Sequence, residues 1–496
     1  MNTRTAGRTA SVTSALLLLC LVSFPAWAAG VRCDFLCYMT AANEASLVML
    51  REQGLLPPDL ARGIGRGVAR IEREQAEPGA KRWTNYLDFE KRLIEIAGAE
   101  ASRLHTGRSR QDLHETVRRM LMRDEHLDTF GRLQEARTAL QELAGRHVET
   151  VIPAYTHGVQ AQPTTLAHYL LAFDAALGRD AERLREIYPR LNLSPLGSAA
   201  FSTSGFAMDR TRLATLLGFD GPVQNSYDAN LLSSADVKIE LANALANSAI
   251  HVGQFAQDLH AQYREARPWM LVDESTTDIS SLMPQKRNPR PVDRLRSRAT
   301  DVIAGAQAVT LAAHNTHTGM NDYRGTEPLF AVTEAAQGMY GAWAKLLGGL
   351  QVDPVAARAV VAGDYATMTE VADTLLREAG VPFRVAHHYA SELTDYGRAR
   401  GKRPADLTAE EIRGVYREAI GEPLPLPPGA IHDAMDPAKM VAARRGLGGP
   451  QPAEVRRMLE VQQALARADR NWLKARRDAL QAAAAAREAA FEAATR

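Results

Sequence analysis

Long stretches of the chain repeat apolar side chains at intervals of three, four or seven residues, the periodicity of one buried helix face. Residues 166–191 and 292–313 show this pattern most clearly. The segments 229–262 and 328–350 are also long and have no internal proline. Helices of about 25 to 35 residues reach about 40–50 Å, which predicts a mostly α-helical protein with a long bundle. Such helices are hard to bury within one subunit, so we expect an oligomer.

Turn-forming residues and proline-rich segments divide the chain into predicted domains. These are a signal peptide (1–28), an N-terminal helical domain (29–108), a central helical bundle (109–353), a C-terminal helical domain (354–460) and an Ala/Arg-rich helical tail (461–496). In and just before the tail, a seven-residue apolar spacing predicts the packed face of a long helix, formed by Met458, Leu465, Trp472 and Ala479.

The N-terminus has the pattern of a secretory signal peptide. Arg4 and Arg8 precede an apolar core at about 15–24, and the small-residue site Ala-Trp-Ala follows at 26–28. The apolar run is shorter than the ~20 residues that a membrane span needs, so a membrane anchor is the weaker alternative. Lipid attachment at Cys20 is weaker still, because a bulky leucine precedes it. We therefore expect a periplasmic or secreted protein with no membrane attachment after cleavage.

The charge balance and the cysteine content limit the classes of ligand that the sequence favours. The 59 basic and 58 acidic side chains nearly cancel, and no basic run marks a nucleic-acid surface, so a small-molecule substrate is favoured. Cleavage after residue 28 would change the net charge from +1 to −1. Cys33 and Cys37 then remain: in an oxidising compartment they can form a local disulfide, and two free thiols are the alternative. Two cysteines without nearby histidines do not indicate a metal site.

Three polar stretches carry candidate chemistry. They are LHTGRSRQD (104–112), PAYTHGVQAQP (153–163) and DISSLMPQKRNP (278–289). The third is a loop, because Pro284 and Pro289 interrupt any regular helix. Each stretch also has a purely structural interpretation: Ser109 and Arg110 can begin a helix, and His157 can be a hydrogen-bonded turn residue.

Together the three stretches resemble the argininosuccinate lyase branch of the fumarase/aspartase superfamily. Further similar segments follow the same order as in that family, at 194–229, 381–388 and 441–455. The resemblance implies a three-domain, mostly α-helical subunit with a long central bundle, assembled as a homotetramer whose active sites each take residues from three subunits. It also implies elimination of an amine from a succinyl group to leave fumarate, with no cofactor and no metal.

The resemblance implies a role for each catalytic candidate. Ser280 matches the base that removes the Cβ proton, and a serine can do this only if its ionised form is stabilised nearby. Lys286 and Asn288 are expected to stabilise charge on the substrate carboxylate. His157 matches the acid, or its relay, on the leaving-group side. Asp293 stands where the family pairs that histidine with a glutamate, one methylene longer.

The binding candidates match the family less evenly. Ser109 and Arg110 match residues that bind the succinyl carboxylates, and Thr156 matches one that contacts a carboxylate. Gln111 replaces the usual asparagine and can make the same hydrogen bonds. Ile279 replaces a glycine, and its branched side chain disfavours a positive φ angle, so we expect slower loop closure.

The stretch 314–330 departs furthest from the family. Thr318, Tyr323 and Thr326 stand where argininosuccinate lyases have tyrosine, glutamine and lysine around the arginine end of the substrate, and Tyr86 replaces a histidine of the substrate site. The half that should bind fumarate is largely kept, with Tyr323 a further candidate for substrate binding. We therefore expect a carbon–nitrogen lyase acting on argininosuccinate or on an aminopolycarboxylate such as ethylenediamine-disuccinate.

A second function of a different class stays open: a catalytically silent binding or structural protein on the lyase scaffold, as in the related lens crystallins. Ile279, Gln111 and the altered stretch 318–326 favour it. The intact Ser280, Lys286, Asn288 and His157 oppose it. A fumarate-release assay separates the two.

The signal-peptide hypothesis makes the first prediction. Protein recovered from the periplasm or medium should lack residues 1–28, because the Ala-Trp-Ala site directs cleavage there. The intact mass of the exported protein tests this, and a mass that includes those 28 residues would show that the segment is retained.

Overall fold

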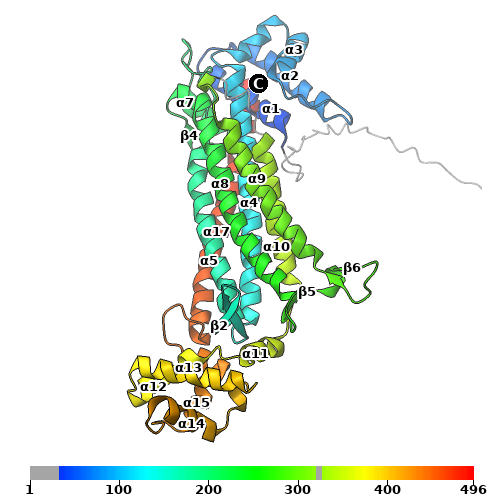
Figure 1. Cartoon of the computed structure of the whole chain (residues 1–496). Helices are drawn as coiled ribbons and strands as arrows, with labels where there is room; N and C mark the ends of the chain where they lie inside the picture. The colour runs from blue at the N-terminus through cyan, green and yellow to red at the C-terminus, as the bar shows by residue number, and fades with distance from the viewer. Residues whose placement is uncertain (1–32, 320–326) are drawn as a thin grey trace, which may run out of the picture.

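The computed structural model describes residues 33–319 and 327–496. It is elongated and almost entirely helical, with a bundle of long helices between an N-terminal and a C-terminal helical region (Figure 1). The mostly α-helical prediction is thereby confirmed. The predicted signal peptide, Tyr323 and Thr326 lie outside the described residues. Within those residues, no helix has the length and apolar character to cross a membrane, and no group of three or more His, Cys, Asp or Glu could hold a metal ion.

Five long helices form the central bundle. They are α4 (Arg110–Arg146), α5 (Leu166–Leu191), α8 (Ser233–Gln262), α9 (Arg290–Ala313) and α10 (Glu327–Gly348). Each packs against the next in this order, and α10 returns to pack against α4. The predicted periodicity explains the packing, because the apolar positions of α9 are buried: Val292, Leu295, Ala299, Val302, Ala306 and Val309. With 37 residues, α4 is about 55 Å long.

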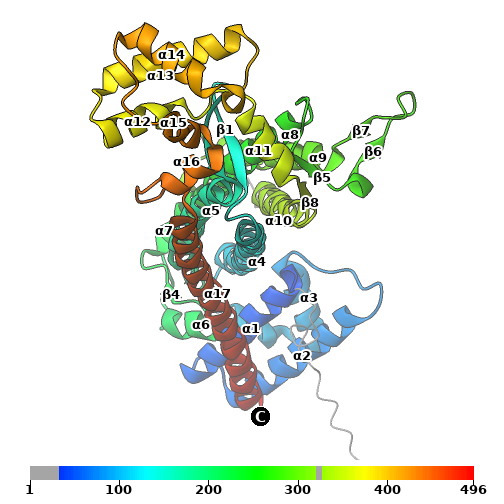
Figure 2. The ribbon, with the colours of Figure 1, turned by 90° about the horizontal axis from the view of Figure 1, so that it is seen from below.

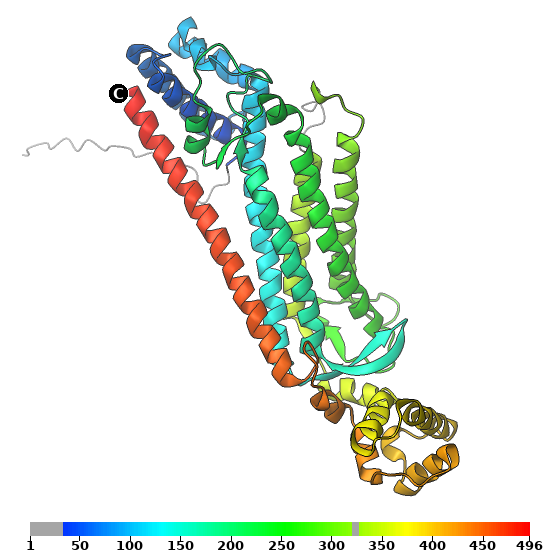
Figure 3. The same ribbon diagram turned by 90° about the vertical axis from the view of Figure 1, so that its left-hand side faces the viewer.

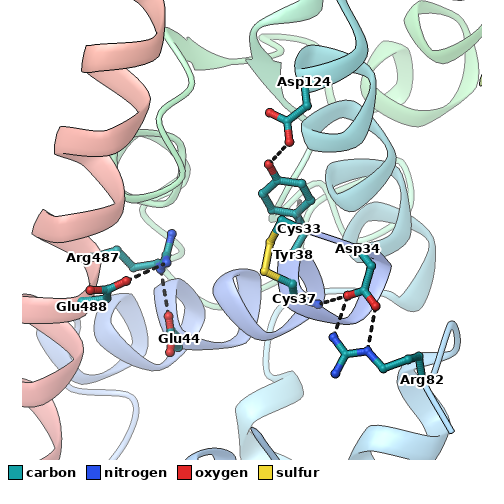
Figure 4. The surroundings of a disulfide bond; sticks show 9 residues. All are labelled: Cys33, Asp34, Cys37, Tyr38, Glu44, Arg82, Asp124, Arg487 and Glu488. Atoms are coloured by element: carbon teal, nitrogen blue, oxygen red, sulfur yellow. Dashed lines mark hydrogen bonds and ion pairs between the residues drawn. A yellow bond between two sulfur atoms is a disulfide. The ribbon is translucent and has the colours of Figure 1, made fainter. Parts of the chain in front are cut away.

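The N-terminal region has a core of its own. It contains α1 (Phe35–Glu52), α2 (Pro58–Ala76), α3 (Tyr86–Ala97) and the 3-10 helix η2 (Ala99–His105). A disulfide joins Cys33 to Cys37 across the first turn of α1, with their Cα atoms 5.4 Å apart (Figure 4). Asp34 between them accepts from the Cys37 N–H at 2.9 Å and pairs with Arg82 at 2.7 Å. The start of α1 is thus held both covalently and by a cap.

The C-terminal region consists of short helices. They are α11 (Pro354–Ala362), α12 (Met368–Ala379), α13 (Phe383–Ala399), η5 (Pro404–Asp406), α14 (Ala409–Ile420), α15 (Pro428–Met435) and α16 (Pro437–Ala443). Helices α12 to α15 share a separate small core, in which Val371, Leu375, Tyr389 and Leu393 are fully buried. Helix N-caps stand at Ser109 and Asp353, next to the domain edges predicted near residues 108 and 353. The division into domains stays a prediction.

The described strands form four short pairs. Three are antiparallel: β1 (Val151–Thr156) with β2 (Val159–Thr165), β5 (Met270–Val272) with β8 (Leu350–Val352), and β6 (Asp278–Ile279) with β7 (Arg287–Asn288). The fourth is parallel, β3 (Leu193–Ser194) with β4 (Gly221–Pro222). Between these elements lie α6 (Arg210–Leu216), α7 (Ser226–Leu231) and the 3-10 helix η3 (Glu274–Thr276). The β1–β2 and β6–β7 hairpins carry predicted site residues.

The last helix, α17 (Pro452–Thr495), has 44 residues and runs back along the bundle to the N-terminal region (Figures 2 and 3). It continues without a break through the domain edge expected at residue 460. Near its end Arg487 pairs with Glu44 of α1 at 2.8 Å, and Phe491 packs against the N-terminal core (Figure 4). The first and last described helices, α1 and α17, are therefore joined in one packed region.

The prediction of which face of α17 is packed is only partly correct. Leu465 and Ala479 are exposed, whereas Val455, Ala466 and Leu473 are buried. A strict seven-residue spacing drifts around a straight helix of 3.6 residues per turn, so the stripe leaves the packed face.

A buried ion-pair network also fixes α17 on the bundle. Arg137 of α4 is fully buried and donates to Asp174 of α5 at 2.9 Å and to Asp469 of α17 at 2.7 Å. Gln141 donates to the second oxygen of Asp174 at 2.8 Å. Arg185, whose side chain is 42% exposed, also pairs with Asp469 at 3.1 Å. The network thus joins three helices and reaches solvent only at Arg185 and the edge of Asp469.

Removing one partner of this network should be costly. We expect Asp469→Ala to lower the free energy of unfolding by about 3 kcal/mol, because it leaves Arg137 buried with one carboxylate fewer. The matched control on the same helix is Asp478→Ala, which removes an exposed pair with Lys474 and should cost at most about 0.5 kcal/mol. Denaturant titration at fixed protein concentration measures both, and equal losses would contradict the role of the network.

Candidate active site

Ser280 begins the loop of the β6–β7 hairpin. Its Oγ atom accepts hydrogen bonds from the backbone N–H groups of Leu282 at 3.3 Å and Met283 at 3.1 Å. The N–H of Lys286 donates to the Met283 carbonyl at 3.0 Å and closes the turn. Two N–H dipoles directed at one oxygen favour negative charge there, so the turn supplies part of the stabilisation that a serine base requires.

The base of the loop is clamped by pairing and by two ion pairs. Ile279 lies opposite Arg287 in the hairpin, and Arg287 binds Glu274 at 2.7 Å and the Pro284 carbonyl at 2.8 Å. Arg290 of α9 holds Asp278 at 2.5 Å. Ile279 has no positive φ angle; it is in a strand, where a β-branched residue fits well.

Lys286 and Asn288 extend from the same hairpin, with Lys286 exposed and Asn288 half-buried in β7. Asp293 follows in the first turn of α9 and is exposed. The loop therefore presents a hydroxyl, an ammonium and a carboxamide together at the surface of this one chain.

His157 stands at the tip of the β1–β2 hairpin. Thr156 pairs with Val159, which leaves His157 and Gly158 as a two-residue turn with φ angles of 53° and 78°. Two successive positive φ angles are the signature of a type I′ turn, which matches the twist of a hairpin. The turn holds the exposed imidazole beyond the bundle, next to the exposed Thr156. No hydrogen bond or ion pair found within 33–319 and 327–496 joins it to Asp293.

Ser109, Arg110 and Gln111 form the N-terminus of α4. The Ser109 Oγ accepts from the Gln111 N–H at 3.2 Å, and the Arg110 side chain is exposed on the first turn. Free N–H groups and the helix dipole make such a terminus favourable for anions, and Arg110 adds a fixed positive charge. The structural interpretation, in which Ser109 caps the helix, is compatible with the binding interpretation, in which Ser109 contacts a substrate carboxylate.

Asp112 was not predicted as a site residue, yet it organises this end. One carboxylate oxygen accepts from the Ser109 N–H at 2.6 Å, and the other from the N–H groups of Gly197 and Ala199 at 2.8 and 3.0 Å. Burial raises the pKa of this carboxyl to about 6. The Ser-x-x-Asp spacing of a capping box was the available signal for its first contact, whereas nothing in the sequence indicated the second.

Tyr86 also differs from expectation. It is fully buried and stacks on His105, with ring centroids 4.5 Å apart. The Arg108 guanidinium lies 5.0 Å from the Tyr86 ring centroid. Tyr86 is therefore part of the N-terminal core rather than of the surface.

The predicted residues fall into two groups at opposite ends of the bundle. The Arg110 group, at the N-terminal end of α4, consists of Ser109, Arg110, Gln111 and Thr318. The Ser280 group, towards the C-terminal region, consists of Thr156, His157, Ser280, Lys286, Asn288 and Asp293 (Figure 1). Because α4 is a single helix of about 55 Å, Ser109 before it and His157 after it cannot meet within one chain.

Comparison with known proteins identifies the family. Residues 80–304 match the family described as Lyase, and residues 365–442 match the family described as Argininosuccinate lyase C-terminal. The argininosuccinate lyase of Methanosarcina barkeri is 34% identical over 428 residues, which cover 85% of this chain and 86% of that protein. The chain is a lyase of the fumarase/aspartase superfamily.

Solved structures agree with this lyase assignment. EDDS lyase in complex with formate superposes with a TM-score of 0.85 at 29% identity, covering 93% of this chain and 92% of that one. An EDDS lyase variant with bound fumarate gives a TM-score of 0.84 at the same identity and coverage. The prediction of a fumarate-releasing lyase of this superfamily is confirmed at the level of the family.

The raised pKa of Asp112 makes a test of its burial possible in this lyase. A carboxyl whose folded pKa exceeds its unfolded value contributes stability at low pH that is lost as pH rises through the folded pKa, here about 6. Asparagine does not titrate. Between pH 5 and pH 7.5 the free energy of unfolding of the wild type should therefore fall by about 1 kcal/mol more than that of Asp112→Asn.

Denaturant titrations at several pH values give the change in unfolding free energy with pH for the wild type and the variant. The other titrating groups contribute equally to both proteins, so the difference between the two slopes reports Asp112. Identical slopes would mean that the folded pKa of Asp112 is close to its ordinary value.

Proposed function

We propose that this lyase cleaves a carbon–nitrogen bond by reversible β-elimination, releasing fumarate and an amine from an N-substituted aspartate. The observation that carries this proposal is the environment of Ser280. Its Oγ accepts hydrogen bonds from two backbone N–H groups. The clamped loop that carries it also presents Lys286 and Asn288. This arrangement suits proton removal beside a carboxylate.

Ser280, as an alkoxide, takes the Cβ proton of the aspartyl group. The electron pair of that C–H bond moves into the adjacent carboxylate, whose growing charge Lys286 and Asn288 stabilise, a contribution commonly worth ~3–4 kcal/mol. The pair then returns to form the carbon–carbon double bond of fumarate as the carbon–nitrogen bond breaks. His157 delivers a proton to the departing nitrogen, and Asp293 orients the imidazole.

The substrate carboxylates are held by Ser109, Arg110 and Gln111 together with Thr156. Arg110 offers two parallel donors to one carboxylate, and Ser109 and Gln111 lie beside it at the helix terminus. Tyr323 is proposed as a further substrate contact. No metal or cofactor is assigned a role.

The separation of the two groups supports a homotetramer with shared sites. One subunit would supply the Arg110 group and others the Ser280 loop and the His157 hairpin, since no single chain can bring these together. The partners of the chain are thus further copies of itself and a small molecule.

The residues at the amine end of the proposed site bear on which amine is released. Thr318 stands where argininosuccinate lyases have a tyrosine, so the arginine end of argininosuccinate loses a contact. The similarity to EDDS lyase supports an aminopolycarboxylate as an alternative substrate. We therefore propose an N-substituted aspartate, with argininosuccinate and an aminopolycarboxylate of the ethylenediamine-disuccinate type as candidates.

We also propose that the enzyme works in the periplasm or outside the cell. The N-terminal pattern supports export, and the disulfide between Cys33 and Cys37 suits an oxidising compartment.

Ser280→Ala tests the mechanism. Purified mature protein is incubated with excess fumarate and a panel of amines including arginine and ethylenediamine, and adducts are detected by mass spectrometry. We expect Ser280→Ala to lower the rate of adduct formation by about 10²–10⁴-fold, because the base is lost.

The matched control is Ser281→Ala, which removes the same hydroxyl one residue later and should retain most of the activity. Equal rates in wild type and Ser280→Ala would contradict Ser280 as the base. A folded wild-type protein that forms no adduct would point to a catalytically silent scaffold instead.

A further inference from the structure

Three aromatic side chains are exposed at the Arg110 end of the bundle. Phe201 is 50% exposed, Phe206 53% and Tyr227 44%. Large apolar rings gathered at the surface next to charged and hydrogen-bonding groups mark binding sites more often than single exposed leucines do. None of the three has a role in the chemistry described above.

The segment that carries the two phenylalanines is fastened to the start of α4 at two points. On one side of them, the N–H groups of Gly197 and Ala199 donate to buried Asp112. On the other, Met208 packs so closely on Gly107 that a Cβ atom there would lie 2.4 Å from the sulfur. Phe201 and Phe206 therefore lie between two anchors that flank Ser109 and Arg110 in the sequence.

The backbone below Phe201 is strained and firmly braced. Ala199, Ala200 and Thr203 have φ angles of 48°, 76° and 60°, a region that residues with a side chain rarely adopt. Asn230 donates to the Ser198 hydroxyl at 2.7 Å and to the Ala200 carbonyl at 2.5 Å. Such strain persists only where surrounding contacts impose it, and it clusters at ligand sites.

Tyr227 connects these rings to the amine side of the proposed site. Its ring lies edge-on to Phe201 with centroids 5.9 Å apart, and the Ser226 hydroxyl holds the Phe201 carbonyl at 2.8 Å. The Tyr227 hydroxyl is 3.0 Å from the Thr318 hydroxyl. The aromatic pair thus meets Thr318, one of the positions at which a residue expected around arginine is replaced.

We propose that Phe201 and Tyr227 form an aromatic subsite for the amine half of the substrate, and that this subsite favours an amine with an aryl or similarly apolar substituent over a small alkylamine. This inference rests on the proposed function and names the substrate class of the same site. Ring faces favour stacked or edge-on aromatic groups and attract an ammonium. The two hydroxyls of Tyr227 and Thr318 offer a polar contact for the nitrogen.

The occupant is the substrate rather than a partner chain for two reasons. The rings sit on the segment that is bonded through Asp112 to the helix terminus carrying Arg110, the residue proposed to bind the substrate carboxylate. The hydroxyl pair of Tyr227 and Thr318 is also exposed among the rings, and an apolar contact between subunits would not require it.

The test compares two amines in the addition to fumarate, methylamine and 2-phenylethylamine. Wild-type protein should use 2-phenylethylamine with at least a tenfold higher kcat/KM. Phe201→Ala should lower kcat/KM for 2-phenylethylamine by about tenfold, corresponding to about 1.4 kcal/mol, and change that for methylamine less than twofold. Tyr227→Ala should lower kcat/KM for both amines, and more for 2-phenylethylamine, because it removes the ring and also a hydroxyl proposed to contact the nitrogen. Ser280→Ala should abolish both reactions.

The matched control is Phe383→Ala, which removes a phenylalanine of similar exposure, 46%, from α13 in the C-terminal region. It should leave both reactions unchanged. Light scattering after size-exclusion chromatography reports the oligomeric state of every variant. Retained assembly in Phe201→Ala together with a selective loss for 2-phenylethylamine supports the subsite.

The outcomes separate this inference from the proposed function. Equal use of both amines, or equal losses in Phe201→Ala, would overturn the aromatic subsite while Ser280-dependent addition still upheld the lyase mechanism. Dissociation of Phe201→Ala into smaller species would show that the rings belong to a subunit interface and would also overturn it. No Ser280-dependent addition of any amine would overturn both proposals.

Discussion

The continuity of α4 is the constraint on which the rest of this structure depends. A helix rises about 1.5 Å per residue, so an unbroken helix of 37 residues separates the groups at its ends by about 55 Å. Ser109 and Arg110 precede or begin it, and the hairpin of His157 follows it. The chemistry expected of this lyase needs an anion-binding end, a base and an acid within a few ångströms. The length of α4 therefore makes assembly of several subunits a requirement of the proposed mechanism.

The bundle keeps α4 straight through packing and through a few buried charges. Helices α5 and α10 cover its apolar positions, and α17 is fixed across it by the network of Arg137, Asp174 and Asp469. Because α17 ends in the N-terminal core, it also couples that core to the far end of the bundle. Both ends of the molecule, each carrying half of the proposed site, are thus held by one continuous set of helices.

Several candidate site residues stand on tight, braced turns, whereas Arg110 and Asp293 lie in the first turns of α4 and α9. A type I′ turn positions His157, two N–H groups orient the Ser280 hydroxyl, and Asp112 ties the segment of Phe201 to the start of α4. Turns of this kind place polar groups at the surface, where several subunits can meet. The long helices set the distance between the two groups, and the described side chains with proposed roles lie on turns and strands or in the first turn of a helix.

The sequence by itself determined the helical fold and the members of the proposed site. Apolar periodicity located the bundle helices, and the motifs around Arg110, His157 and Ser280 indicated the lyase superfamily, because local pattern and residue type carry both kinds of information. Only the tertiary structure decided which residues share an end of the bundle, that Ile279 lies in a strand, that Tyr86 is buried, and that Asp469 belongs to the packed face of α17. It also revealed the second contact of Asp112 and the exposed rings of Phe201 and Tyr227. These features depend on contacts between residues far apart in the chain. Local spacing in the sequence does not show which distant residue pairs with a buried charge, or which aromatic ring stays exposed.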